Sequence, residues 1–158
     1  MWVRALLFWI CMAVPARACD LALVLAVDVS GSMDSRDYVL GDRPVNRLEV
    51  VKSVAGRFIE RRRGDRLGLI LFGSRAYLQT PLTYDRATVR TMLDESVIGL
   101  AGRETAIGDA IGLAVKRLGG RQDENRVLIL LTDGTNTAGG LAPLDAAGLA
   151  AQVGVRVY

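Results

Sequence analysis

A run of seven apolar residues, Leu21 to Val27, leads directly into the polar sequence Asp28-Val29-Ser30-Gly31-Ser32. An apolar run with no polar alternation is typical of a strand that is buried on both faces of a parallel sheet. Such sheets bind ligands in the crevice at the carboxyl ends of their strands, which is where Asp28 and the two serines fall. The sequence therefore predicts a covered parallel sheet with oxygen-bearing side chains at one edge.

The spacing of these side chains favours a metal site. Asp28, Ser30 and Ser32 alternate along the chain, and Gly31 gives the backbone the freedom to fold their oxygens toward one point. Carboxylate and hydroxyl oxygens are hard donors, which suit Mg²⁺ or Mn²⁺ better than zinc.

Strand and helix patterns alternate along the rest of the chain. Further apolar strands are predicted at 67–72 and 127–131, a short edge strand at 76–80 ending at Pro81, and the start of another strand at 155–158. Helical periodicity occurs over 47–62, 85–97, 105–118 and 143–153, whereas 33–46 is polar and predicts a loop. This order predicts one α/β domain with a doubly wound, mostly parallel sheet and helices on both faces.

Two later polar residues belong to the same predicted edge. Asp133 follows the strand at 127–131, and Thr105 precedes a helix. Loops that follow neighbouring strands of a doubly wound sheet face one another, so we expect two acids and three hydroxyls to converge. Taken singly, Ser30 or Thr105 is more often a helix cap, and an aspartate before glycine is often a turn residue. The combination favours a metal site formed by Asp28, Ser30, Ser32, Thr105 and Asp133.

Composition excludes several functions. Histidine is absent, which excludes Ser-His-Asp and Cys-His catalysis and any histidine metal ligand. The net charge is +3, but Arg4 and Arg17 lie in the first 18 residues with no acid beside them, so the remainder is nearly balanced. A nucleic-acid partner therefore has little support.

The first 18 residues resemble a targeting segment. A short basic start is followed by the apolar stretch Ala5 to Val14 and by Ala16-Arg17-Ala18. These are the three parts of a secretory signal, so we expect export to the periplasm or to the periplasmic face of the inner membrane. A retained membrane anchor, which would associate the protein with the membrane, and lipidation at Cys19 are the alternatives.

The metal motif also carries a family resemblance. Asp28-x-Ser30-x-Ser32, with the later Thr105 and Asp133, resembles the metal-ion-dependent adhesion site of the von Willebrand factor A (VWA) family. Four further stretches resemble the bacterial aerotolerance (Bat) branch of that family, and the similarity covers residues 21–158. They are Gly64-Asp65-Arg66-Leu67-Gly68-Leu69, Thr80-Pro81-Leu82-Thr83, Thr105-Ala106-Ile107-Gly108-Asp109-Ala110 and Leu130-Leu131-Thr132-Asp133-Gly134.

The resemblance implies a VWA domain over residues 19–158, incomplete at its C-terminal end because the family's fold generally continues through another strand and helix. It implies that Ser30, Ser32 and Thr105 coordinate Mg²⁺, with Mn²⁺ as the alternative, while Asp28 and Asp133 act largely through bound water. The expected function is metal-dependent protein binding in the bacterial envelope, without catalysis. A carboxylate of a partner, expected among envelope proteins of the same operon, would complete the coordination.

Three other functions compete with this interpretation. A Mg²⁺-dependent phosphatase would use Asp28 as its nucleophile, but Ser30 stands where the second acid of that pattern is required. The glycine-rich motifs that bind nucleotides are absent. A VWA scaffold with a purely structural site, and no ligand exchange, is the third alternative.

Overall fold

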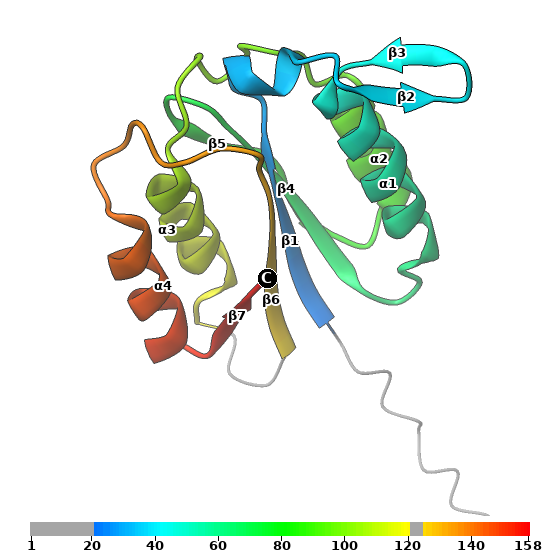
Figure 1. Ribbon diagram of the computed structural model, residues 1–158. Helices are drawn as coiled ribbons and strands as arrows, with labels where there is room; N and C mark the ends of the chain where they lie inside the picture. The colour runs from blue at the N-terminus through cyan, green and yellow to red at the C-terminus, as the bar shows by residue number, and fades with distance from the viewer. Residues whose placement is uncertain (1–20, 121–124) are drawn as a thin grey trace, which may run out of the picture.

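The computed structural model describes residues 21–120 and 125–158, which form a five-stranded sheet with two helices on each face (Figure 1). The strands are β1 (Leu21–Asp28), β4 (Arg66–Phe72), β5 (Ala76–Thr83), β6 (Asn125–Leu131) and β7 (Val155–Val157). The helices are η1 (Gly31–Asp34), a short 3₁₀ helix, and α1 (Arg47–Arg61), α2 (Arg86–Asp94), α3 (Ile107–Leu118) and α4 (Pro143–Gln152). The predicted signal segment and Cys19 lie outside the described residues.

The sheet has the order β5-β4-β1-β6-β7, and all neighbouring strands are parallel except β4 and β5. The predicted doubly wound fold is therefore confirmed. Strand β1 lies at the centre, paired with β4 on one side and β6 on the other. Because strands are extended, β1 directs alternate side chains to opposite faces of the sheet.

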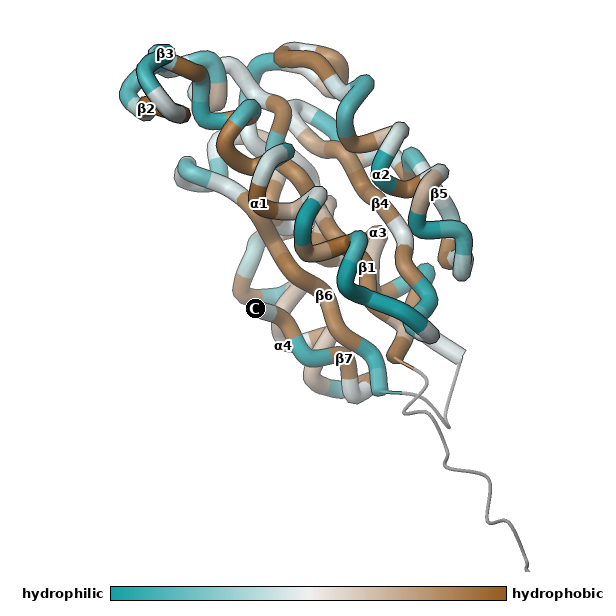
Figure 2. The backbone as a smooth tube through the Cα atoms, turned by 90° about the vertical axis from the view of Figure 1, so that its right-hand side faces the viewer, coloured by the Kyte–Doolittle hydropathy of each residue, from teal (hydrophilic) through white to brown (hydrophobic). Residues whose placement is uncertain are grey.

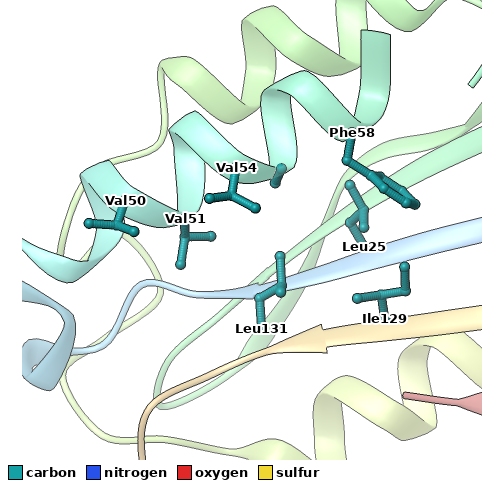
Figure 3. Close-up of a pocket in the computed structure, with 8 residues that line it drawn as sticks. Leu25, Val50, Val51, Val54, Phe58, Ile129 and Leu131 are labelled. Carbon is teal, nitrogen blue, oxygen red and sulfur yellow. The ribbon is translucent and has the colours of Figure 1, made fainter. Parts of the chain in front are cut away.

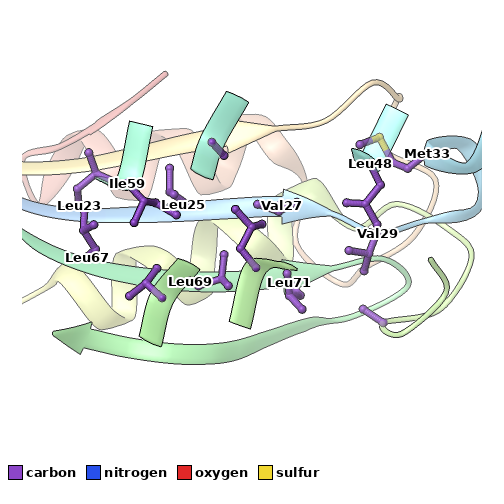
Figure 4. Packing of buried hydrophobic residues seen from close by; sticks show 14 of the residues in the cluster. Leu23, Leu25, Val27, Val29, Met33, Leu48, Ile59, Leu67, Leu69 and Leu71 are labelled. Carbon is purple, nitrogen blue, oxygen red and sulfur yellow. The ribbon is translucent and has the colours of Figure 1, made fainter. Parts of the chain in front are cut away.

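Both faces of β1 are covered, as the apolar run predicts. Leu23, Leu25 and Val27 contribute to the core beneath α1 and α2, which Figure 4 shows from close by. Ala22, Val24 and Ala26 contribute to the second core beneath α3 and α4. The small alanines on this second face let α3 approach the sheet closely. Figure 2 shows how hydropathy varies along the backbone, with apolar central strands and polar segments at the surface.

Three helices begin as the sequence predicts, and one does not. Side chains cap α1 and α2, since Asn46 accepts the N–H of Glu49 and Asp85 accepts the N–H of Thr88, and α4 opens at Pro143. Helix α3 starts at Ile107 rather than at the expected Thr105. The N–H of Ile107 donates to Oδ1 of Asn136, in a distant loop, at 2.8 Å. The prediction that Thr105 caps the helix is therefore wrong.

Two irregular segments also differ from prediction. The expected loop at 33–46 contains the end of η1 and an antiparallel hairpin of β2 (Tyr38–Leu40) and β3 (Arg43–Val45), with Gly41 at a φ of 65° in its turn. Strand β5 continues past Pro81 instead of ending there. It lies at the edge of the sheet, where the missing N–H of a proline does not cost a hydrogen bond between strands. The pairing with β4 is shifted on that stretch.

An apolar cavity of about 280 Å³ lies between α1 and strands β1 and β6, where Val54 and Phe58 face Ile129 and Leu131 (Figure 3). Within the described part of the chain, no helix is both long enough and apolar enough to span a bilayer.

Candidate metal centre

The five residues predicted from the sequence meet at one end of the sheet. Strand β1 ends at Asp28 and leads through Ser30 into η1, while neighbouring β6 ends just before Thr132 and Asp133. The loop before α3 is attached to the same end, because the N–H of Ala106 donates to the carbonyl of Gly73, just after β4, at 2.8 Å.

Hydroxyl groups form a continuous chain through the centre. The Thr105 hydroxyl donates to Ser30 Oγ at 3.2 Å, and Ser30 Oγ lies 3.0 Å from Ser32 Oγ. Ser32 Oγ in turn donates to Oδ1 of Asp133 at 2.8 Å. Since each hydroxyl has one proton, Ser30 must be the donor to Ser32, and the chain runs from Thr105 to Asp133. Three hydroxyl oxygens and one carboxylate oxygen are thereby gathered in one place.

The interior of this chain is shielded, and its outer end is open. Ser30 is 0% exposed and Thr105 is 5% exposed, whereas Ser32 lies at the surface. The centre is therefore open to solvent on the side of Ser32 and Asp133.

Asp28 is fully buried behind the hydroxyls. Its Oδ1 accepts the backbone N–H of Ser30 at 2.8 Å, and its Oδ2 accepts the hydroxyl of Thr132 at 2.7 Å. None of the ion pairs between described residues involves Asp28. A buried carboxylate with no counter-cation is costly, so this environment favours a bound cation. Sequence reasoning missed Thr132, although its place at the end of β6 matches that of Asp28 at the end of β1.

Sequence reasoning also missed Arg47, the first residue of α1. Its guanidinium bonds both carboxylate oxygens of Asp37, with Nε at 3.1 and 3.0 Å, and also contacts Oδ2 of Asp133. The bond to Asp37 and then that to Asp133 raise the pKa of Arg47 above its ordinary value, and Arg47 lowers the pKa of Asp37. Arg47 therefore remains charged, and it contributes a fixed positive charge beside the centre. No sequence motif distinguished it from the other helical arginines.

The loop after β6 is fastened onto the start of α3. The backbone N–H of Thr105 donates to the hydroxyl of Thr137 at 2.9 Å, and the Thr105 carbonyl accepts the N–H groups of Thr137 and Ala138. Asp109 Oδ1, in the first turn of α3, accepts the N–H groups of Gly140 at 3.1 Å and Leu141 at 3.0 Å. These bonds hold Thr105 in place relative to Asp133, so the centre is organised before any ligand binds.

The donor set decides which chemistry the centre can perform. Among the described residues, no group of three or more acidic, histidine or cysteine side chains has metal-binding geometry. The centre instead combines three neutral hydroxyls with two acids. Such a set can hold a hard divalent cation.

Comparison with known proteins identifies the domain family. The family model for the von Willebrand factor type A domain matches residues 23–136. An uncharacterized protein of Borreliella burgdorferi is 29% identical over 136 residues, which cover 86% of this chain and 39% of that protein. The chain thus spans about two fifths of that curated relative.

Solved structures agree with the family match. An aerotolerance-related membrane protein of Bacteroides fragilis is 30% identical with a TM-score of 0.76, over 87% of this chain and 65% of that one. A membrane spanning protein of Vibrio fischeri is 50% identical with a TM-score of 0.62, over 88% and 69% of the two chains. Proximal thread matrix protein 1 of the mussel byssus, described with a zinc occupied MIDAS motif, is 22% identical over 88% and 37% of the chains, with a TM-score of 0.68, and shares the fold.

Proposed function

Because this chain belongs to the von Willebrand factor type A domain family and resembles its aerotolerance-related members, we propose that the centre is a metal-ion-dependent adhesion site. It binds a divalent cation and, through that cation, a carboxylate of a partner protein. The observation that carries the proposal is the buried carboxylate of Asp28, which lacks a counter-cation among the described residues and lies behind three converging hydroxyls.

The residues fit a cation in distinct roles. Ser30, Ser32 and Thr105 would hold it directly, and Asp28 and Asp133 would act largely through water. Hydroxyl ligands carry no formal charge, so a cation held this way keeps much of its charge and its affinity for an external anion. A carboxylate from a partner satisfies that affinity at the open side of the site.

The chemistry of the donors favours Mg²⁺ or Mn²⁺, because all of them are oxygens and no cysteine or histidine is present at the centre. Zinc was found in the corresponding motif of the mussel protein. Zinc therefore belongs among the ions to be compared for this chain.

Binding explains the geometry better than turnover does. A phosphatase would need Asp28 as a free nucleophile, yet both of its oxygens accept hydrogen bonds and its side chain is fully buried. Domains of this family also generally serve as interaction modules. A purely structural metal site is the remaining alternative, and it differs from an adhesion site by not exchanging a ligand.

We also propose that the domain works in the bacterial envelope, with partners among other envelope proteins. Two structural relatives are described as membrane proteins, and one of these as aerotolerance-related. The basic and apolar start of this sequence, with Ala16-Arg17-Ala18, supplies a route of export.

Isothermal titration of the 158-residue chain with MgCl₂, MnCl₂ and ZnCl₂ tests the metal site. We expect one site per chain, with affinity lowered at least a hundredfold in the variant Ser30→Ala/Ser32→Ala/Thr105→Ala, because it removes three ligands where even a supporting group is worth about ten- to hundredfold. The variant Ser53→Ala/Thr91→Ala, which removes hydroxyls from α1 and α2, should bind like the native chain.

Equal affinity in the triple variant would place the metal elsewhere. A second measurement, the binding of acetate to the metal-loaded protein, separates an adhesion site from a structural one. A metal that shows no interaction with acetate would indicate a site without ligand exchange.

A further inference from the structure

We infer that Arg47 is a specificity-determining residue of the metal centre, which weakens the binding of the cation and provides a second contact for the partner's carboxylate. The inference rests on the proposed function, and it concerns a residue outside the five that the sequence pattern marks. Three observations support it: the way Arg47 is held, the way it shares Asp133, and the space beside it.

Arg47 is fixed from both ends. Its backbone N–H donates to the carbonyl of Ser35 at 3.2 Å, and its position at the start of α1 follows the capping residue Asn46. Its guanidinium makes a forked contact with Asp37, which uses two of its nitrogens. A forked arginine-carboxylate pair sets direction as well as distance, so the third nitrogen is aimed at Asp133 rather than free to turn away.

Asp133 shows where an external carboxylate would fit. One of its oxygens accepts the hydroxyl of Ser32 at 2.8 Å, and the other accepts Arg47. A single carboxylate therefore spans the distance between a predicted metal ligand and the guanidinium. A partner carboxylate bound to a cation at Ser32 meets the same two neighbours, and Arg47 can donate to its second oxygen.

The space beside Arg47 admits such a group. A hollow of about 460 Å³ opens next to Asp133, lined by Met33, Tyr38, Arg47, Val50, Val51 and Thr132. The side chain of Arg47 is 31% exposed, so it is reachable from solvent. The apolar walls suit the methylene groups of an aspartate or glutamate side chain, while Arg47 suits its carboxylate.

The charges give opposite effects on the cation and on the anion. A divalent cation together with Arg47 balances the three carboxylates of Asp28, Asp37 and Asp133, which leaves the loaded centre neutral toward an approaching anion. Loss of the guanidinium charge would leave the loaded centre negative. The cation would then bind more tightly and the anion more weakly.

Titrations of Arg47→Gln test both effects. We expect its affinity for Mn²⁺ alone to rise about three- to tenfold, because a repelling charge and a competitor for Asp133 are both removed. The affinity of the Mg²⁺-loaded variant for acetate should fall about fivefold, the upper range for an exposed ion pair. In the native chain, acetate should shift the ¹⁵N resonance of Arg47 Nε when Mg²⁺ is present and not when it is absent.

Arg43→Gln is the matched control. Arg43 lies on β3 with its side chain 76% exposed and faces Glu49, so its loss lowers the net charge equally without touching the centre. It should leave both affinities unchanged. Arg47→Lys keeps the charge but not the fork, and should retain the native affinity for Mn²⁺ while losing part of the affinity for acetate.

The outcomes separate this inference from the proposed function. If the native chain binds Mn²⁺ but Arg47→Gln binds it no more tightly, or binds acetate equally well, Arg47 has only a structural role and the inference is wrong. If the native chain binds no divalent cation, the proposed function and the inference both fail. Circular dichroism of each variant shows whether an altered affinity reflects loss of the fold.

Discussion

The replacement Asp28→Asn separates the stability of the domain from its affinity for metal. Asparagine has nearly the same shape, and it can accept the N–H of Ser30 with its oxygen while donating to Thr132 with its nitrogen. Thr132 Oγ1 can act as an acceptor there, as it already does toward the N–H of Gly134 at 3.3 Å. Both hydrogen bonds survive, and the buried charge is removed.

The expected magnitude follows from these contacts. A buried, uncompensated carboxylate costs several kcal/mol of stability, which the substitution removes. The two charge-assisted hydrogen bonds become weaker neutral ones, which offsets roughly 2 kcal/mol of that gain. We therefore expect the metal-free variant to be more stable than the native chain by about 1–2 kcal/mol. Its affinity for Mg²⁺ should fall by about a hundredfold or more, because the cation loses its charge balance.

Thermal unfolding with and without MgCl₂ measures both effects. At a concentration about 100 times the dissociation constant, a ligand stabilises the native state by about 2.7 kcal/mol, which corresponds to a rise in Tm of about 5–10 °C for a domain of this size. The native chain should show this rise, whereas Asp28→Asn should start from a higher Tm and gain almost nothing. Asp145→Asn, on the exposed face of α4, should behave like the native chain.

A metal-free Asp28→Asn protein that is less stable than the native chain would refute this reasoning. It would show that the carboxylate is satisfied without a cation and that its burial is not evidence for a metal site. An undiminished rise in Tm on adding MgCl₂ would refute the role of Asp28 in charge balance.

Two further predictions concern packing and export. Gly108→Ala should destabilise the domain by about 1–3 kcal/mol in urea unfolding, because its Cβ would lie 1.9 Å from the carbonyl oxygen of Leu141. The control Gly148→Ala, whose Cβ would meet nothing within 4 Å, should be neutral or stabilising by up to about 1 kcal/mol. Equal effects of the two substitutions would show that the loop before α4 moves to accommodate the Cβ. N-terminal sequencing of protein from fractionated cells should find Cys19 as the first residue in the envelope fraction, and an intact Met1 in the cytoplasm would contradict export.

The sequence was sufficient for the sheet because its signals were local. The apolar run before Asp28 and the matching run at 127–131 predicted buried neighbouring strands, and the turn residues between segments separated helix from strand. The hairpin at 38–45 was missed because each of its strands has only three residues, most of them exposed, and Pro44 stands inside β3. The sequence predicts β5 as an edge strand, and the structure confirms this, but the expected end at Pro81 is wrong because the shifted pairing with β4 lets the strand continue to Thr83.

Acidic residues at strand ends were predictable from the sequence, as Asp28 and Asp133 show. Thr132 also follows a strand but was not predicted, because a threonine at a strand end is common and its role depends on Asp28, 104 residues away. Arg47 was not predicted because an arginine in a helix is common and its role depends on Asp133, 86 residues away. The cap of α3 is of the same kind, because Asn136 reaches Ile107 from across the loop.

The two acids of the centre have different tasks, and the direction of the hydroxyl chain shows why both are needed. A hydroxyl that coordinates a cation through its oxygen must turn its proton elsewhere, so each ligand requires an acceptor behind it. Asp133 already accepts the proton of Ser32. Ser32 Oγ accepts the proton of Ser30, and Ser30 Oγ accepts that of Thr105. Asp28 accepts no proton from these three hydroxyls; it holds the backbone of Ser30 and the hydroxyl of Thr132. Asp28 therefore supplies charge and shape, while Asp133, shared with Arg47 at the surface, orients the outermost ligand and connects the cation site to the residue that we expect to recognise the partner.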